Sequence, residues 1–311
     1  MGTFATDRLS VLTLGTATLG MAYGVANPIC APDEAAADAL LDSAWRGGIA
    51  CFDTAPAYGE AETRIGAWRR RTGAAPLVVS KLPPVADTPA APIETVVSRA
   101  ARKSMQRLGL TQLDGYITHA AADFLRPEVR AALDALKAEK RIRAAGASVY
   151  SPEEVFAALA TGAIDMIQLP LNLLDRRMIE SGAIAACHQA GAAVFGRSAF
   201  LQGALLMTPA SLPAYLLALG PVLAKLADLA AEAGTSILSL ALRAVRDTPD
   251  VATVVVGAYD RNQLRALLAA ADEPPLEGGL ADELSALAKQ APAACLDPRT
   301  WPMPGRHAAS G

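Results

Sequence analysis

The chain has 311 residues, of which 52% are hydrophobic, and a formal net charge of −3. This length is enough for one large hydrophobic core or for two ordinary domains. The near balance of charge, without a run of Lys and Arg, argues against a nucleic-acid partner. Apolar runs are broken by Gly, Asp or Arg well short of the ~20 residues of a membrane span, and residues 1–10 lack a signal-peptide pattern. We therefore expect a cytoplasmic protein with no membrane partner.

The cysteines and histidines offer no metal-binding pattern. The four cysteines are scattered without a C-x-x-C pair: Cys30, Cys51, Cys187 and Cys295. In a cytosolic chain such thiols stay reduced and pack as small hydrophobic side chains. The three histidines are not spaced as ligands with the cysteines or with one another: His119, His188 and His307. No metal site is predicted.

One pattern repeats along the chain: a short apolar run, then a loop, then a longer Ala- and Leu-rich segment with helical periodicity. Eight of the short runs are continuously apolar, which is typical of strands buried on both faces of a parallel sheet. The predicted strands are Val11–Leu14, Ile49–Asp53, Leu77–Lys81, Asp114–His119, Ile142–Ala147, Met166–Leu169, Ala192–Gly196 and Thr253–Gly257.

Helices are predicted between these strands. The first, Asp33–Arg46, follows Pro32, a suitable first-turn residue, and stops at Gly47. The others are Glu60–Arg70, Ile93–Leu108, Pro127–Glu139, Pro152–Ala160, Arg176–Ala190, Leu212–Ala233, Ile237–Arg246, Arg261–Ala271 and Asp282–Gln290. The last lies in a Pro- and Ala-rich tail, residues 274–311, for which two courses are open: folding back over the barrel mouth, or fraying.

Eight alternating units predict an α/β fold of the (β/α)₈ or TIM barrel class, with residues 1–311 forming a single domain. No Ser- or Gly-rich linker divides the chain. A doubly wound dinucleotide-binding sheet would carry G-x-G-x-x-G after an early strand, and the segment Gly15–Gly20 lacks that spacing.

Polar residues lie where three neighbouring strands end. Asp53 ends the second predicted strand, Lys81 the third and His119 the fourth, and Tyr58 follows in the loop after Asp53. Catalytic groups of barrels project from the C-terminal strand ends and the loops after them, so these four side chains should converge. Each alone has an ordinary structural explanation, but the ordered set of four favours a catalytic site.

The chemistry of this quartet follows from proton affinity. A Tyr titrates near ~10, and a nearby ammonium lowers that value by stabilising the phenolate. Lys81 supplies the ammonium and Asp53 holds it, while His119 can hydrogen-bond a substrate oxygen. Together they describe a proton donor, Tyr58, for a carbonyl oxygen that becomes an alkoxide. None of the four delivers a hydride, so a cofactor must.

The ordered motifs over residues 9–272 resemble the aldo-keto reductases. The most specific is Ile49–Gly66, and the others are Val78–Lys81, Leu113–His119, Gly146–Tyr150, Ile167–Asn172, Arg197–Gly203 and Val256–Ala258. The resemblance implies reduction of an aldehyde or ketone by a nicotinamide cofactor, with Tyr58 as general acid/base, Lys81 and Asp53 tuning it, and His119 orienting the carbonyl.

The same resemblance implies cofactor-binding positions. Ser148 and Gln168 would hold the nicotinamide carboxamide, although Val149 stands where many members have Asn. Arg197 falls where the family has an aromatic residue stacked on the nicotinamide, and a guanidinium plane can also stack. The pyrophosphate would lie under a loop formed by Ser198, Leu201 and Gly203.

The adenosine end departs from the family. Members that prefer NADPH place basic residues after the eighth strand and an Asn further along the following helix, and those positions are occupied here by Gly257, Ala258, Tyr259 and Leu267. Asp260 would repel a 2′-phosphate, whereas Arg261 and Gln263 could reach one. Because a phosphate without a firm cationic partner binds poorly, the cofactor is expected to be NAD(P)H with a preference for NADH.

Two other functions stay open. The same fold serves NAD(H)-binding regulators with little or no turnover, including a bacterial group that acts on cell division, and such a protein would have a protein partner. A barrel with phosphate-handling lyase chemistry would leave Tyr58 and Lys81 unexplained. Carbonyl reduction of a small molecule is the principal hypothesis.

Overall fold

The computed structural model describes residues 4–25, 31–87 and 91–302. Eight parallel strands form a closed barrel in which each strand pairs with its sequence neighbours and β8 returns to β1. The strands are β1 (Leu12–Gly15), β2 (Cys51–Asp53), β3 (Leu77–Leu82), β4 (Leu113–Thr118), β5 (Ile142–Ser148), β6 (Met166–Pro170), β7 (Ala193–Arg197) and β8 (Val251–Val256). Every predicted strand is present within two residues at each end, which confirms the (β/α)₈ barrel.

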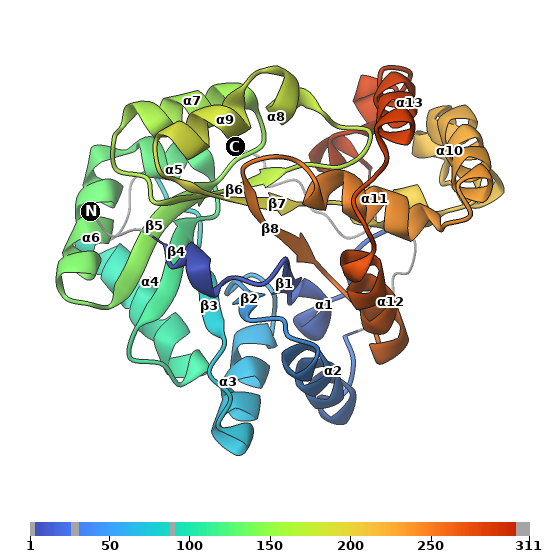
Figure 1. Cartoon of the computed structure of the whole chain (residues 1–311). Coiled ribbons are helices and arrows are strands. Elements are labelled where there is room, and N and C mark those ends of the chain that lie inside the picture. Colours follow the sequence, from blue (N-terminus) through green and yellow to red (C-terminus); the bar gives the residue numbers. More distant parts are fainter. Residues whose placement is uncertain (1–3, 26–30, 88–90, 303–311) are drawn as a thin grey trace.

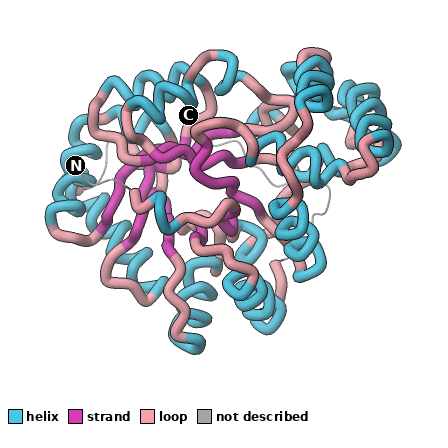
Figure 2. Tube along the Cα trace, viewed as in Figure 1, coloured by secondary structure: helices cyan, strands magenta, loops and turns pink. Residues whose placement is uncertain are grey.

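Helices surround the barrel, as Figures 1 and 2 show. Those that follow the predictions are α2 (Glu34–Arg46), α3 (Ala61–Thr72), α4 (Ile93–Leu108), α6 (Pro127–Ala138), α7 (Pro152–Ala160), α11 (Ile237–Arg246), α12 (Arg261–Asp272) and α13 (Gly278–Ala288). Their starts have local causes: Asp33, Ser151, Ser236 and Asp260 each accept a hydrogen bond from a backbone amide of the first turn.

Of the helices above, α13 begins at Gly278 and not at the predicted Asp282. Two other predicted helices were wrong in their extent. The segment Arg176–Ala190 forms two short helices, α8 (Arg177–Glu180) and α9 (Ala183–Gln189), because Gly182 adopts a left-handed conformation with φ of 75°. The segment Leu212–Ala233 starts as 3₁₀ turns over Ala214–Leu219, and its α-helix α10 covers Gly220–Glu232. Pro221 has no amide hydrogen to donate, which explains why the α-helix begins there.

Two further short helices were not predicted, α1 (Ala17–Gly20) and α5 (Ala121–Leu125). Each lies in a loop that follows a barrel strand on the side of the catalytic residues. Four or five residues are too few for a periodic pattern to be recognised.

Among the described residues, three apolar clusters stabilise the structure. The main one lies between the barrel and its helices. Another fills the barrel interior, where Phe4 packs edge-on against Phe195 with ring centroids 5.2 Å apart. A third joins α10, α11 and α13 to the last residues described, including the buried Trp301. Figure 1 shows α10 and α13 side by side at the edge of the molecule, where they pack together.

The apolar segment Ala214–Glu232 is long and apolar enough to cross a membrane by length and composition alone. Its buried residues, among them Leu219, Leu223 and Leu226, belong to the third cluster and pack inside the protein. This is the only segment of that kind in residues 4–25, 31–87 and 91–302.

Candidate active site

The four residues predicted to converge do so at the C-terminal end of the strands. Asp53 is the last residue of β2, and Lys81 lies near the end of β3. His119 follows β4 and donates its backbone amide to Leu82 at 3.1 Å, and Tyr58 lies in the turn before α3. The barrel therefore brings side chains from three adjacent strands to one mouth.

Asp53 and Lys81 form a buried ion pair. The Lys81 Nζ donates to both carboxylate oxygens of Asp53 at 2.8 Å and to the Thr54 carbonyl oxygen at 3.1 Å. Their side chains are 4% and 1% exposed, respectively. Burial is the largest single effect on the Lys81 ammonium and lowers its pKa, but the charges of Asp53 and Tyr58 and the hydrogen bonds to them together outweigh burial and raise the pKa. Lys81 therefore stays charged at neutral pH.

Tyr58 and His119 lie beside this pair. The Lys81 Nζ is 4.9 Å from the centroid of the Tyr58 ring, and the rings of Tyr58 and His119 meet edge to face with centroids 6.2 Å apart. Burial raises the pKa of Tyr58 more than the charge of Lys81 lowers it, so the expected net lowering is not found. Burial and the charge of Lys81 lower the pKa of His119 to about 4, so its imidazole is neutral at physiological pH.

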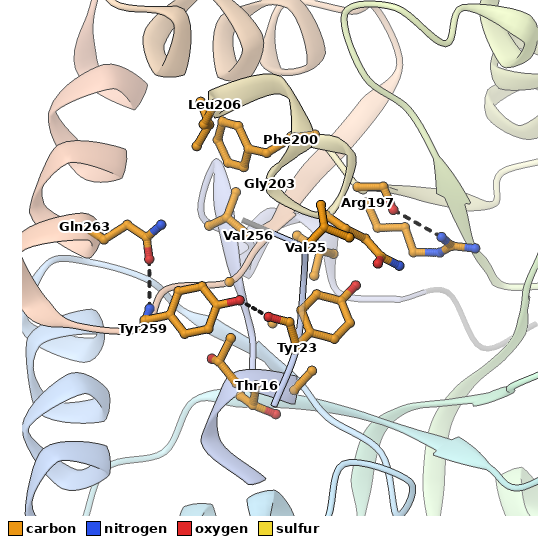
Figure 3. A pocket seen from close by; sticks show the side chains of 18 of the residues that line it. Thr16, Tyr23, Val25, Arg197, Phe200, Gly203, Leu206, Val256, Tyr259 and Gln263 are labelled. Atoms are coloured by element: carbon orange, nitrogen blue, oxygen red, sulfur yellow. Dashed lines mark hydrogen bonds between the residues drawn. The ribbon is translucent and has the colours of Figure 1, made fainter. Parts of the chain in front are cut away.

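A cavity of about 660 Å³ opens beside Asp53 and Tyr58 and extends to the loops after β7 and β8. Tyr58 and Asp53 line it, as do six of the predicted cofactor residues: Gln168, Arg197, Ser198, Gly203, Gly257 and Gln263. Figure 3 shows Gly203, Phe200 and Leu206 on one side of this cavity, with Tyr259 and Tyr23 opposite.

Gln168 and Ser148 occupy paired positions on β6 and β5. Both are buried, and the Gln168 amide nitrogen donates to Asp53 Oδ1 at 2.8 Å. This contact with the ion pair was not expected from the sequence, which assigned Gln168 to the carboxamide alone.

Arg197 is the last residue of β7, and its guanidinium is held on three sides. It donates to the Val149 carbonyl oxygen at 3.0 Å and to the Ser198 hydroxyl at 3.3 Å, and it lies 4.1 Å from the centroid of the Tyr150 ring. Arg299, from the predicted C-terminal tail, also lies against that ring, at 4.0 Å. The tail therefore reaches the barrel mouth at Tyr150; residues 303–311 lie outside the described part.

The loop after β7 has an unusual backbone. Ser198, Leu201 and Gln202 have positive φ angles of 65°, 48° and 54°, and Gly203 follows at 94°. Strained backbone of this kind clusters at ligand sites. The Leu201 side chain packs into the third apolar cluster and does not line the cavity. Gln202 does line it, although only its neighbours Leu201 and Gly203 were predicted to bind the cofactor.

The loop after β8 closes the far end of the cavity. The Tyr259 amide donates to the Gln263 side-chain oxygen at 2.8 Å, and the Tyr259 hydroxyl donates to the Tyr23 carbonyl oxygen (Figure 3). Asp260 accepts from the amides of Asn262 and Gln263, both at 2.8 Å. Arg261 is exposed and does not line the cavity.

Aromatic side chains are natural candidates for lining a substrate pocket, but of Tyr23, Phe124 and Trp301 only Tyr23 lines the cavity. Phe124 is 1% exposed in the main core, and Trp301 packs against Tyr215 with ring centroids 6.0 Å apart. Aromatic residues favour both cores and pockets, so residue type alone could not separate the two. Cavity residues that were not predicted include Thr16, Thr18 and Val25 from the segment after β1.

The cavity suits a nicotinamide dinucleotide. Such a ligand needs an elongated cleft with a few polar contacts, and this one runs from Tyr58 to Gln263. The side-chain oxygen of Gln202 is buried without a hydrogen-bond partner in the described structure. A ligand hydroxyl or amino group would satisfy it.

Comparison with known proteins agrees with this geometry. The model of the aldo/keto reductase family matches residues 11–287, and the chain belongs to that family. The NADH-specific methylglyoxal reductase of Escherichia coli (strain K12) is 32% identical over 188 residues, which are 54% of this chain and 57% of that protein. The match thus spans little more than half of the relative. The family match, which spans most of this chain, is the finding that establishes the family.

Solved structures support the fold. The holo form of aldo-keto reductase AKR11C1 from Bacillus halodurans has a TM-score of 0.77 at 24% identity, with 94% of this chain and 96% of that chain covered. The glycerol dehydrogenase AKR11B4 from Gluconobacter oxydans has a TM-score of 0.73 at 21% identity, with 97% and 96% covered.

Proposed function

We propose that this protein reduces a small aldehyde or ketone with NADH, and that Tyr58 is the general acid. The observation that carries the proposal is the buried Asp53–Lys81 pair beside Tyr58, at the wall of a cavity that also reaches Gln263. A bound nicotinamide cofactor would supply the hydride. The substrate class follows from the proton donor, which serves a carbonyl oxygen that gains negative charge.

In the proposed reaction, neutral His119 donates a hydrogen bond to the substrate oxygen and orients the carbonyl. Tyr58 then gives its proton to the forming alkoxide, and Lys81 stabilises the phenolate that remains. Asp53 keeps Lys81 charged in a buried site, where an isolated ammonium would lose its proton. In the reverse direction, the Tyr58 phenolate takes the proton of an alcohol.

The preference for NADH rests on Asp260. Its carboxylate already occupies the first amides of α12, where a 2′-phosphate would otherwise find donors, and it adds a repelling charge. The described residues that line the cavity include one cation, Arg197, which lies at the opposite end, near Tyr58. The E. coli relative that is NADH-specific makes methylglyoxal a reasonable first substrate to test.

Substitution of Tyr58 by Phe tests the proposal. Phe keeps the ring and removes the proton, so turnover of methylglyoxal and other small carbonyls should fall by about 10²–10⁴-fold. NADH binding, followed by fluorescence, should change little, and it should be tighter than NADPH binding in the wild type. Unchanged turnover in the variant would refute the role of Tyr58. A wild type that binds NADH but turns over no carbonyl in a broad panel would favour the regulatory alternative.

A further inference from the structure

We infer that Gln168 is a positioning residue for proton donation, because it fixes the Asp53 carboxylate from the opposite wall of the barrel. The inference rests on the proposed function and adds a residue to it. Gln168 lies on β6 and Asp53 on β2, and these strands are not neighbours in the barrel. Their 2.8 Å hydrogen bond therefore crosses the barrel interior.

The contacts of Asp53 show what this hydrogen bond adds. Lys81 donates to both carboxylate oxygens of Asp53 at equal distances of 2.8 Å. Because this single donor lies symmetrically between the two oxygens, it leaves the plane of the carboxylate free to rotate. Gln168 donates to Oδ1 alone and removes that freedom. Because Lys81 also contacts Tyr58, the orientation of Asp53 is passed on to the proton donor.

Burial makes the contact strong. Gln168 is 1% exposed and Asp53 3%. A hydrogen bond from an amide to a buried carboxylate contributes more than one between neutral groups. Gln168 also lines the cavity, so one amide contacts both the ion pair and the space for the cofactor. Loss of Gln168 should therefore affect two steps, cofactor binding and proton transfer, whereas loss of Ser148 should affect the first alone.

The catalytic test compares Gln168→Met with Ser148→Ala. Gln168→Met keeps the length of the side chain and removes the donor, so kcat should fall roughly tenfold. The alkaline limb of the pH profile, which reports Tyr58, should move to higher pH by about half a unit or more, because Lys81 is held less firmly against the phenol. Ser148→Ala should raise KM for NADH and leave the limb in place. The inference would be overturned if the alkaline limb of the pH profile moved equally in both variants, or in neither.

A second measurement needs no turnover. Gln168→Glu keeps the shape and puts a second carboxylate against Asp53, so one carboxyl of the pair holds its proton to a higher pH in the folded state than in the unfolded state. Compared with Gln168→Met, the Gln168→Glu protein should therefore be more stable at low pH, and this difference should be lost as the pH rises. The unfolding equilibrium constant should rise by about tenfold or more between about pH 5 and pH 8.

The matched control is Gln106→Glu, an exposed glutamine on α4. If Gln168→Glu shows the flat pH dependence of this control, Gln168 does not act on Asp53 and the inference fails. If the wild type turns over no carbonyl but Gln168→Glu shows the pH-dependent loss, the proposed function fails and the contact between Gln168 and Asp53 stands.

Discussion

The Cα of Gly20 packs directly against the backbone carbonyl of Tyr58: a Cβ placed on Gly20 would lie 1.7 Å from that oxygen. Gly59, the next residue after Tyr58, faces Gly20 in return, and a Cβ on it would lie 2.3 Å from the Gly20 carbonyl oxygen. The loop after β1 and the loop that carries the proton donor thus touch backbone to backbone. Residues of the first loop, such as Thr16 and Tyr23, line the cavity, so both loops must keep their places together.

Gly20→Ala should therefore displace Tyr58. We expect a loss of about 1–3 kcal/mol in the free energy of unfolding, the usual cost of overpacking. A displacement of about 1 Å would lower turnover roughly a hundredfold. Urea denaturation and steady-state kinetics measure the two effects. Gly278→Ala is the control, because a Cβ there meets no atom within 4 Å and should lower neither quantity. Normal kinetics in Gly20→Ala would show that the loops adapt.

The low pKa of His119 predicts a loss of stability in acid. Burial lowers this pKa to about 4, below the 6.5 of an unperturbed imidazole. Between these values the unfolded chain binds a proton at this residue and the folded chain does not, so stability falls as the pH falls from 6.5 to 4. The group contributes roughly 2–3 kcal/mol to this loss. Urea denaturation at several pH values should show a shallower dependence in His119→Gln; identical curves for wild type and variant would contradict the prediction.

Cofactor preference should respond to the charge of Asp260. Asp260→Asn keeps a good helix cap and removes the negative charge, so NADPH affinity should rise about fivefold while NADH affinity changes less. Asp260→Ala also removes the charge but loses the cap on Asn262 and Gln263, and should cost about 1 kcal/mol of stability. Fluorescence titration of each variant with NADH and with NADPH measures these affinities. Equal responses to NADH and NADPH in both variants would mean that Asp260 does not set the preference.

The parts of the site that could be predicted are those that follow from the order of elements. Asp53, Lys81 and His119 lie at or beside strand ends, and the alternation of strands and helices alone places such positions at one mouth. Strand bounds were also accurate because the strands are buried on both faces and read as short apolar runs. The break between two helices at Gly182 and the helix start beside Pro221 were missed, because the apolar pattern continues through both positions.

The contacts that shape the site could not be predicted, because they join residues far apart in the chain. Tyr259 meets Tyr23, and Gln168 meets Asp53, across 236 and 115 positions. Neither contact can be recognised from the periodicity of the sequence or from the spacing of its motifs. The net pKa shift of Tyr58 was missed for a related reason: the charge of Lys81 is visible in the sequence, but the burial that outweighs it is not.

In the loop after β7, Gln202 should lower the stability of the protein. Gln202 has φ and ψ of 54° and 27°, a left-handed conformation that costs a residue with a Cβ about 1–2 kcal/mol, and its side-chain oxygen is buried without a partner. Gln202→Gly relieves both and should stabilise the protein by about 1 kcal/mol. Gln202→Ala removes only the oxygen and keeps the strained backbone, so it should stabilise less.

Both variants of Gln202 should bind NADH more weakly, by roughly fivefold, because they lose the oxygen that a cofactor would satisfy. Gln202→Gly should lose somewhat more than Gln202→Ala, since a glycine leaves the loop less ordered before the cofactor arrives. Thermal unfolding and fluorescence titration of the three proteins separate stability from binding. A glycine variant that binds NADH as tightly as the wild type would show that the strain serves no purpose in cofactor binding.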